Sequence, residues 1–429
     1  MLKKQFRKTI IPAIIAFFLS GIYVSIDGLF IGNSVGDEGL AAINIAWPVV
    51  AIILALGVGI GMGGSIHMSI QRGAGNEDKA QQFQGNTLLM LFLAALFTTT
   101  VFYFFATPIL ALLGAKGAVL EMATQYVQIL ALGSLFQIAG QGTNPLLRNQ
   151  GKPWIAMAMM ILNFVLDTSL SGIFTLYLGY GVAGAAIASV IGQGMAFLPI
   201  LYLLFNKSNR VPLSAYKLST ERVQKIVSAG LSPFALSFIP ALTTLILNLQ
   251  AAHHGGTVAV ASFAVLGYIF SVGQLLIQGI SDGAQPLISF QYGANHQENV
   301  TLVRKWTYQT AITVGFLIFG LAWLGSSIIP VVFNTSAQAG QLLHLAIPLY
   351  LASLPFYAIT RVTTSFVNAI GKNHLSSILT YGEGLVLIPI LAILLPLLFQ
   401  LNGVWGTVLV SQMILGSLSY LLIKKLRLD

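Results

Sequence analysis

Apolar runs long enough to cross a membrane follow one another along the whole chain, separated by short polar loops. A helix of about 20 apolar residues spans a hydrocarbon core of roughly 30 Å. Because lipid offers the backbone no hydrogen-bond partners, such runs are expected to be helices and not open strands. The pattern predicts an all-α membrane protein with twelve transmembrane helices, near residues 10–31, 40–70, 85–112, 119–145, 153–178, 182–205, 225–251, 257–287, 303–330, 341–366, 375–398 and 403–424.

The composition supports lipid as the surrounding solvent. Of the 429 residues, 56% are hydrophobic and 8% are charged, whereas an ordinary soluble domain has roughly 25% charged residues. A soluble fold of this size could not cover its surface with so few charges. The chain has no cysteine, which excludes disulfides, thiol catalysis and thiolate metal sites and leaves the redox compartment undecided.

The net charge of +9 would suit a nucleic-acid partner, but the positions of the basic residues argue against one. All of the 21 lysines and arginines except Lys116 and Arg361 lie near the chain ends or beside loops that follow an even-numbered run. The positive-inside rule places this side in the cytoplasm, so both termini are predicted to be cytoplasmic in a bacterial plasma membrane. The basic charge therefore reflects topology, and no nucleic-acid partner is expected.

Short segments of the first half recur 220 residues later in the chain. Glycine and alanine are common here, so one match would mean little. Several matches at one offset, in two loops and inside two helices, indicate a duplication. The matched positions are 71–74 with 291–294, 151–152 with 371–372, Gly59 with Gly279, and Gly63 with Gly283.

Six helices per repeat is an even number, so both halves are expected to have the same orientation in the membrane. Such repeats are related by a pseudo-two-fold axis along the membrane normal, with substrate bound between them near the midplane. We predict an N-terminal lobe at 1–205, a cytoplasmic linker at 206–224, where the loop is most polar, and a C-terminal lobe at 225–429.

Four acidic residues fall inside the predicted spans: Asp27, Asp167, Asp282 and Glu383. An acid at the centre of a membrane helix costs roughly 2.5–3.5 kcal/mol on insertion scales, so it needs a partner, a wet cavity or a bound proton. Asn163 lies one turn before Asp167, which puts both on one helix face. Asp27 can join Asp167 if the first and fifth helices are neighbours.

Two carboxylates close together in a low dielectric favour the binding of a proton by one of them. Such a pair can couple a cation gradient to another event, because one charge moving down about 100 mV releases about 2.3 kcal/mol. Asp27 and Asp167 could instead only hold helices together by hydrogen bonds. Arg361 is expected to pair with an acid, Asp282 or Glu383, more readily than with a substrate.

The other polar residues match no metal, nucleotide or enzyme signature. The six histidines lack the spacing of metal ligands. The glycines of the second run are not followed by Lys-Ser or Lys-Thr, so they form no phosphate-binding loop, and an ATP-driven pump on this chain is excluded. No Ser/His, GxGD or HExxH arrangement of an intramembrane enzyme occurs in the spans. No cofactor is expected other than H⁺ or Na⁺ as a coupling ion.

Five stretches of sequence, in this order, resemble the multidrug and toxic compound extrusion (MATE) family. The last of them is similar to the MepA-like bacterial branch, and the resemblance covers essentially the whole chain. It implies a V-shaped pair of six-helix bundles with a central cavity, which alternates access while exchanging H⁺ or Na⁺ for a drug. The stretches are PAIIAFFLSGIYVSIDGLFIG in the first helix, LLRNQGKPW after the fourth, NFVLD in the fifth, YGVAGAAIAS opening the sixth and SDGAQPLISFQYGA closing the eighth.

The resemblance also implies a cation-coupling site in the N-terminal half. Family members with an acid in the first helix use a site that maps here onto Asp27, Asn163, Asp167 and the hydroxyl of Ser189. The first-helix proline that the family links to bending matches Pro12. Another branch uses acids in helices 7 and 10, but here helix 7 has none and helix 10 carries a basic residue, so that site is not assigned.

The leading hypothesis is a monomeric secondary exporter of small organic drugs and dyes, with membrane lipids as its other partners. Substrate would lie in a cavity lined by aromatic residues and methionines, with Glu383, Asp282 and Arg361 as its charged groups. Such a surface suits lipophilic cations through dispersion, cation–π contact and Coulomb attraction.

The same residues support three other classes of function less well. A flippase for lipid-linked oligosaccharides of the same broad superfamily is the main alternative, but a cavity for pyrophosphate lipids should carry several buried basic residues, and only Arg361 qualifies. A carrier of the major facilitator type would carry a charged signature between helices 2 and 3, where this chain reads IQRGAGNEDKA. An intramembrane enzyme lacks its motifs, as noted above.

Overall fold

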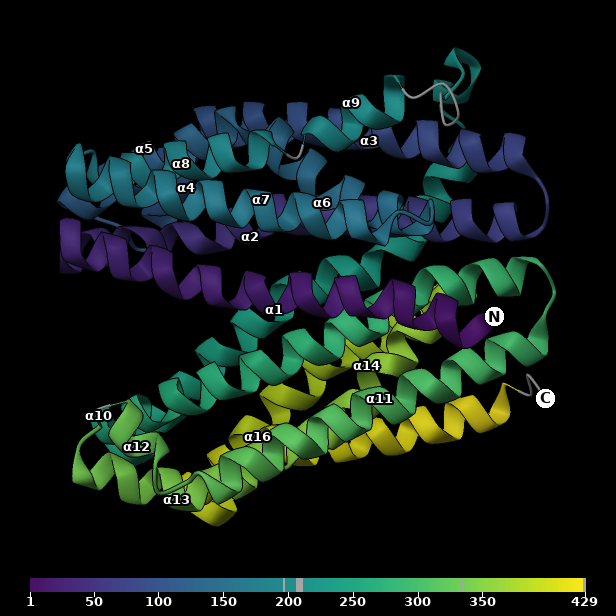
Figure 1. Cartoon of the computed structure of the whole chain (residues 1–429). Helices are drawn as coiled ribbons and strands as arrows, with labels where there is room; N and C mark the ends of the chain where they lie inside the picture. Colours follow the sequence, from purple (N-terminus) through teal and green to yellow (C-terminus); the bar gives the residue numbers. More distant parts are fainter. Residues whose placement is uncertain (196, 206–210, 334, 427–429) are drawn as a thin grey trace. The chain divides into compact units, whose positions relative to one another are not determined.

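A computed structural model of the chain describes residues 1–195, 197–205, 211–333 and 335–426. Within these ranges it describes all side chains except those of residues 22–29, 32, 33, 37, 200 and 203–205. Every regular element in the described ranges is a helix (Figure 1). Hydrogen bonds within each helix satisfy the backbone, as lipid requires.

The helices of the first half begin close to where the polar loops end. Pro153, for example, opens its helix at a position where its missing N–H costs nothing. The elements are α1 (Leu2–Ser34), α2 (Asp37–Gly73), α3 (Glu77–Phe104), α4 (Ala106–Leu112), α5 (Gly117–Leu132), α6 (Ser134–Asn149), α7 (Pro153–Gly172), the π-helix η1 (Ile173–Tyr177), α8 (Gly181–Gly194), α9 (Phe197–Phe205) and the 3₁₀-helix η3 (Leu213–Tyr216).

The second half contains two helices that are long but interrupted. α10 has a left-handed break at Gly256 and α16 has one at Gln400, so each holds two shorter helices. The elements are α10 (Thr220–Gly293), α11 (Gln297–Leu324), α12 (Ile329–Val332), α13 (Ala337–Leu351), α14 (Ser353–Ala369), α15 (Asn373–Tyr381), the π-helix η4 (Gly382–Leu387) and α16 (Ile388–Lys425).

The twelve predicted spans all fall on these helices. By length and apolar composition alone, eight helices in the described part of the chain could cross a membrane, or nine if the bent pair α5 and α6 counts as one span. The lower number arises because α10 holds two predicted spans, and the continuous stretch from α15 to the end of α16 holds two more. In addition, α1, which includes residues 22–29 whose side chains are not described, is not among the counted helices. The prediction of an all-α membrane protein with two helical bundles is confirmed.

The helices form two compact units, Met1–Phe18 with Ile239–Asp429, and Leu19–Phe238. Both units are therefore completed by a segment from the other half of the sequence, since α1 and α10 each contribute to both. The two cuts, after residues 18 and 238, lie 220 residues apart. The lobes predicted from the sequence divide the chain elsewhere, at the polar linker 206–224, and that division stays a prediction.

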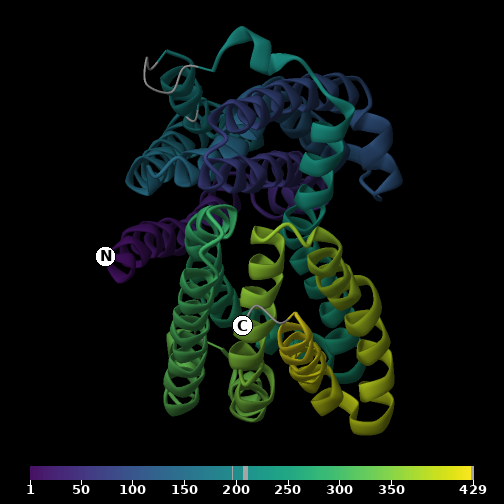
Figure 2. The ribbon, with the colours of Figure 1, turned by 90° about the vertical axis from the view of Figure 1, so that its right-hand side faces the viewer.

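In the unit that contains the C-terminus, α14 packs between α11 and α16 (Figure 2, green to yellow). The start of α1 belongs to this core: Phe6 is buried, and its ring lies 5.6 Å from the ring of Trp306. In the unit Leu19–Phe238, α2 packs against α3 and α6, and α7 against α8. Apolar side chains fill both cores.

Close helix contacts in the two units repeat at the offset seen in the sequence. A β-carbon on Gly59 would lie 3.1 Å from Cβ of Phe234, and one on Gly279 would lie 2.8 Å from Cα of Ile14. The contact of Gly283 with Cα of Ile10, at 2.9 Å, likewise repeats the contact of Gly63 with the backbone nitrogen of Gly230, also at 2.9 Å. Each first-half pair maps onto its second-half counterpart by adding or subtracting 220, so the duplication extends to packing.

Residues with a left-handed backbone repeat at the same offset. Gly151 and Gly371 have φ values of +76° and +78° in the equivalent loops after α6 and α14. Gly36 and Gly256 form a second such pair, with φ values of +74° and +62°. Only glycine adopts this conformation without steric cost, which explains why Gly151 and Gly371 were kept in both halves and could be matched in the sequence.

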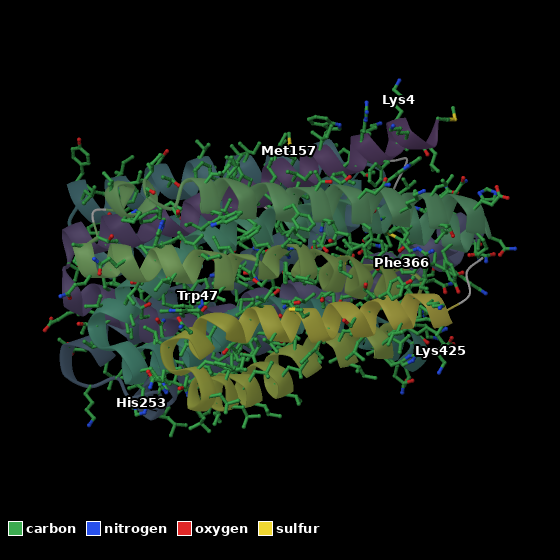
Figure 3. The ribbon with its side chains drawn as sticks, turned by 90° about the horizontal axis from the view of Figure 1, so that it is seen from below. Lys4, Trp47, Met157, His253, Phe366 and Lys425 are labelled. Atoms are coloured by element: carbon green, nitrogen blue, oxygen red, sulfur yellow. The ribbon has the colours of Figure 1, made fainter. Side chains whose placement is uncertain are left out.

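The charged ends of the C-terminal unit agree with the predicted topology. Lys4 and Lys425 lie at one end of this unit, and His253 lies at the opposite end (Figure 3). Both lysines belong to the basic set that the sequence places on the cytoplasmic side. The cytoplasmic location of the termini itself stays a prediction.

Replacing Gly283 by valine should destabilise the protein by about 1–3 kcal/mol, since the added carbons would overlap α1. The matched control is Gly267→Val in the same helix, where a β-carbon meets nothing within 4 Å. Thermal unfolding of both purified variants in detergent tests this. Equal melting temperatures would show that the contact between α10 and α1 is loose.

Candidate functional site

Four polar residues form a column along one face of the fifth membrane helix. Asn163, Asp167, Ser171 and Thr175 follow one another at intervals of four residues through α7 and η1, which puts them on the same face. Asp167 and Ser171 are fully buried, and Thr175 is 1% exposed. Apart from Thr168 and Ser169, the other residues of α7 are apolar or glycine, so the column gathers most of the polar side chains of this helix on one face.

Helix α8 faces this column and supplies its partner. The hydroxyl of Ser189 donates a long hydrogen bond of 3.5 Å to Oδ2 of Asp167. Gly192, one turn further on, permits the close approach, because a β-carbon there would lie 2.9 Å from Cβ of Asp167 and 3.0 Å from Oδ1 of Asn163. The predicted grouping of Asn163, Asp167 and Ser189 is therefore present in the fold.

Two oxygens beside Asp167 are buried without hydrogen-bond partners among the described residues: Oδ1 of Asn163 and Oγ of Ser171. A buried polar atom left unpaired costs free energy, and such atoms in a native fold often indicate a water or ion. An amide oxygen and a hydroxyl next to a carboxylate are the donors that a hard cation such as Na⁺ uses. The residues present fit a coupling cation.

The first-helix acid, Asp27, lies in α1, but its side chain is outside the described part of the structure. The end of α1 does neighbour α7, because a β-carbon on Gly172 would lie 3.4 Å from the ring of Phe30. The condition that the first and fifth helices are neighbours is thus met, whereas contact between the two acids stays a prediction.

In the C-terminal half, Asp282 and Arg361 form a buried ion pair. Nη2 of Arg361 lies 2.7 Å from Oδ1 of Asp282, and both side chains are 6% exposed. Nε2 of Gln278 lies 3.4 Å from the other carboxylate oxygen. The expectation that Arg361 pairs with a membrane acid is confirmed, and Asp282 is that acid.

The fourth acid, Glu383, lies in the π-helix η4 and is partly exposed. Nε2 of Gln412, a fully buried residue of α16, donates a hydrogen bond of 2.6 Å to Oε1 of Glu383. π-Helical turns occur frequently at functional sites. Glu383 therefore has a neutral partner, in contrast to Asp282.

Pro12, the predicted hinge, is buried inside α1, and its missing N–H leaves one gap in the helical ladder. It lies in the segment Met1–Phe18, six residues before the point where α1 passes from one compact unit to the other. Its role in bending stays a prediction.

Sequence reasoning missed Gly192, Ser171 and Gln412. The interval of four residues after Asp167 could have pointed to Ser171, and the 220-residue offset links Gly192 to Gln412. Within the described residues, no group of three or more histidine, aspartate or glutamate side chains could hold a metal ion.

Two repeated helical bundles with charged and polar groups held inside them define a polytopic membrane protein of the transporter class. The MatE family model matches the chain twice, at residues 12–173 and 233–393, once in each half. The chain belongs to this family, and the resemblance noted in the sequence is confirmed.

Individual relatives agree with this placement. The chain is 26% identical to the multidrug export protein MepA of Staphylococcus aureus over 419 residues, which cover 97% of this chain and 92% of the relative. It is also 26% identical to MepA of Staphylococcus haemolyticus, with the same coverage. Two solved structures superpose with TM-scores of 0.93 at 25% identity, over 100% of this chain and 96% of theirs. They are a MATE protein in complex with MaL6 and an outward-facing MATE family multidrug resistance transporter.

Removing one partner of the Asp282–Arg361 pair should cost about 3–5 kcal/mol of stability, because the other charge stays buried and unpaired. Asp282→Asn, Arg361→Gln and the double variant form a cycle in which the double variant recovers much of the loss. Thermal unfolding in detergent measures all three.

The exposed pair Arg72–Glu77, whose nitrogen and oxygen lie 2.9 Å apart, is the control, and its cycle should give only about 0.2–1 kcal/mol. Additive losses at Asp282 and Arg361 would show that the two charges are not energetically coupled.

Proposed function

We propose that this protein is a secondary active multidrug exporter that antiports H⁺ or Na⁺ against lipophilic, often cationic compounds by alternating access. It works in the bacterial plasma membrane as a monomer with both termini in the cytoplasm. The observation that carries the proposal is Asp167, a fully buried acid grouped with Ser189 and Asn163 inside a membrane helix. The names of the relatives, multidrug export protein and multidrug resistance transporter, support the substrate class.

The coupling ion binds at Asp167, with Asn163, Ser189 and Asp27 as the other members of the site. Ionised acids are expensive inside a membrane, so Asp167 is most stable when it holds a proton or Na⁺. Inward movement of that cation down about 100 mV releases about 2.3 kcal/mol per charge, which is available for uphill export. Binding in one state and release in the other transfers this energy.

Glu383, Asp282 and Arg361 belong to the substrate side in this proposal, and they contribute unequally. The contact between Asp282 and Arg361 neutralises both charges, so Glu383 provides the negative charge that attracts a lipophilic cation. The same contact weakens the flippase alternative, because Arg361 is committed to an acid and is not available to a pyrophosphate.

Pro12 is the proposed hinge. A proline inside a helix removes the hydrogen bond to the residue four positions earlier and weakens the helix at that point. Bending there would move α1 relative to α7 without unfolding it, and so change access to the coupling site.

The central test is the replacement of Asp167 by asparagine, which keeps the size of the side chain and removes the charge. Gradient-driven ethidium transport into everted vesicles should fall to the level of empty-vector vesicles. Glu121→Gln, at an exposed acid of α5, is the control and should transport normally. Unchanged transport by Asp167→Asn would refute the coupling role, and separate pH and sodium gradients identify the ion.

Pro12→Ala restores the missing hydrogen bond and should stiffen α1. We expect a transport rate at least several-fold lower, with the affinity for ethidium in detergent unchanged, because the change affects motion and not the binding surface. Fluorescence titration and vesicle transport measure the two quantities. A loss of affinity with an unchanged rate would contradict the hinge.

A further inference from the structure

We propose that Glu383 is a second cation-binding carboxyl, which takes up and releases a proton in the C-terminal half of the chain. The inference rests on the proposed antiport function and deepens it, because it raises the number of protons exchanged for each drug molecule. The carboxyl carries its proton in one state and gives it up to the cytoplasm in the other.

The first argument is position in the repeat. Adding 220 to Asn163 gives Glu383, and adding 220 to Gly192 gives Gln412. In the first half Gly192 lies against Asn163, and in the second half Gln412 lies against Glu383. The two halves thus bring equivalent helices into close contact at an equivalent point, and in the second half an ionisable group, Glu383, lies at that contact.

The second argument is the chemistry of the partner. The amide of Gln412 donates through Nε2 to Oε1 of Glu383 at 2.6 Å. Its own oxygen, Oε1, is buried and has no hydrogen-bond partner among the described residues. An amide can donate to a carboxylate and accept from a carboxylic acid. Gln412 can therefore stabilise both forms of Glu383, and the unpaired oxygen is the acceptor that the proton-bearing form would use.

The hydroxyl of Ser411, the residue before Gln412, is also buried and lacks a partner in the described part of the chain. The unpaired oxygen of Gln412, in the amide that contacts Glu383, indicates that this site is completed by something other than protein. A proton with an accompanying water fits this small set of oxygens better than Na⁺, which requires several oxygen ligands at once.

The third argument is charge. Arg361, on α14, is the basic group that acts on Glu383, but its guanidinium is hydrogen-bonded to Asp282 on α10. Tyr357, on α14, interacts electrostatically with Arg361, Glu383 and Asp282. On the α16 side, the contact is with the neutral Gln412, and Tyr381 lies two residues earlier in the chain.

Arg361 is hydrogen-bonded to Asp282 and interacts electrostatically with Glu383, so these three groups together carry one excess negative charge when both acids are ionised. A charge without a partner is unfavourable within a membrane helix. A single proton on Glu383 removes the excess, and a cationic drug that arrives nearby would displace it.

The test is the thermodynamic stoichiometry in proteoliposomes. With the membrane potential clamped at zero, net transport stops when the two gradients balance. The drug concentration ratio across the membrane then equals the proton concentration ratio raised to the power n, where n is the number of protons exchanged for each drug molecule. For a difference of about half a pH unit, two protons sustain a roughly tenfold ethidium gradient and one proton about threefold. We expect the wild type near the first value and Glu383→Gln near the second. Glu298→Gln, at an exposed acid of α11, is the control and should match the wild type.

If Glu383→Gln does not transport, proton binding is measured directly on the purified, monodisperse protein. Acid–base titration between about pH 5 and about pH 9 counts the groups that change charge near neutrality, a range in which ordinary exposed carboxyls do not titrate. Glu383→Gln should bind one proton fewer than the wild type, and Glu298→Gln the same number.

Equal gradients, or equal proton counts for wild type and Glu383→Gln, would overturn the second site. A sodium gradient that replaces the pH gradient in the wild type but not in Glu383→Gln would overturn the choice of the proton. A wild type that sustains no drug gradient under either ion would refute the proposed function itself, so the two failures are distinguishable.

Discussion

Every polar group inside a membrane needs a partner, and the rest of this structure depends on that constraint. Backbone groups meet it by forming helices, and the few charged side chains meet it by pairing. Asp282 and Arg361 satisfy each other at 2.7 Å. Asp167 lies beside the hydroxyl of Ser189 and close to Gly192, on the same helix face as Asn163. The ion pair fixes Asp282 and Arg361 to each other, which marks them as structural charges.

Because the fold is duplicated, each position in one half has an equivalent position in the other half, where an acid can be placed. Glycine contacts, left-handed loop residues and the division into units all repeat at 220 residues, so the two halves share one scaffold. The chemistry on that scaffold has diverged: Asn163 and Gly192 in one half correspond to Glu383 and Gln412 in the other. A duplicated fold lets one copy keep a site while the other copy changes its charge.

Much of the fold could be predicted, because a membrane helix is determined by local composition. The twelve spans and the offset of the repeat needed no knowledge of contacts between helices. The grouping of Asn163 with Asp167 followed from helical periodicity, and Ser189 from the family resemblance. The pairing of Arg361 with an acid followed from the cost of burying a charge, although the choice of Asp282 over Glu383 required the structure. Gly192 and Gln412 were missed because both are neutral and lie on a different helix from the acids they serve, so no charge or motif marked them.

The start of α1 belongs to the C-terminal unit, and the start of α10 belongs to the other unit. This reciprocal exchange suits an origin from two copies of one repeat. A single ancestral repeat would have lacked the segment that completes its own core, and two copies could have supplied it to each other. That is an exchange of identical elements in a symmetric dimer. Fusion of the two genes would have kept the exchange while freeing each copy to mutate alone. The reciprocal use of α1 and α10 is the arrangement that fusion of such a dimer would leave within one polypeptide.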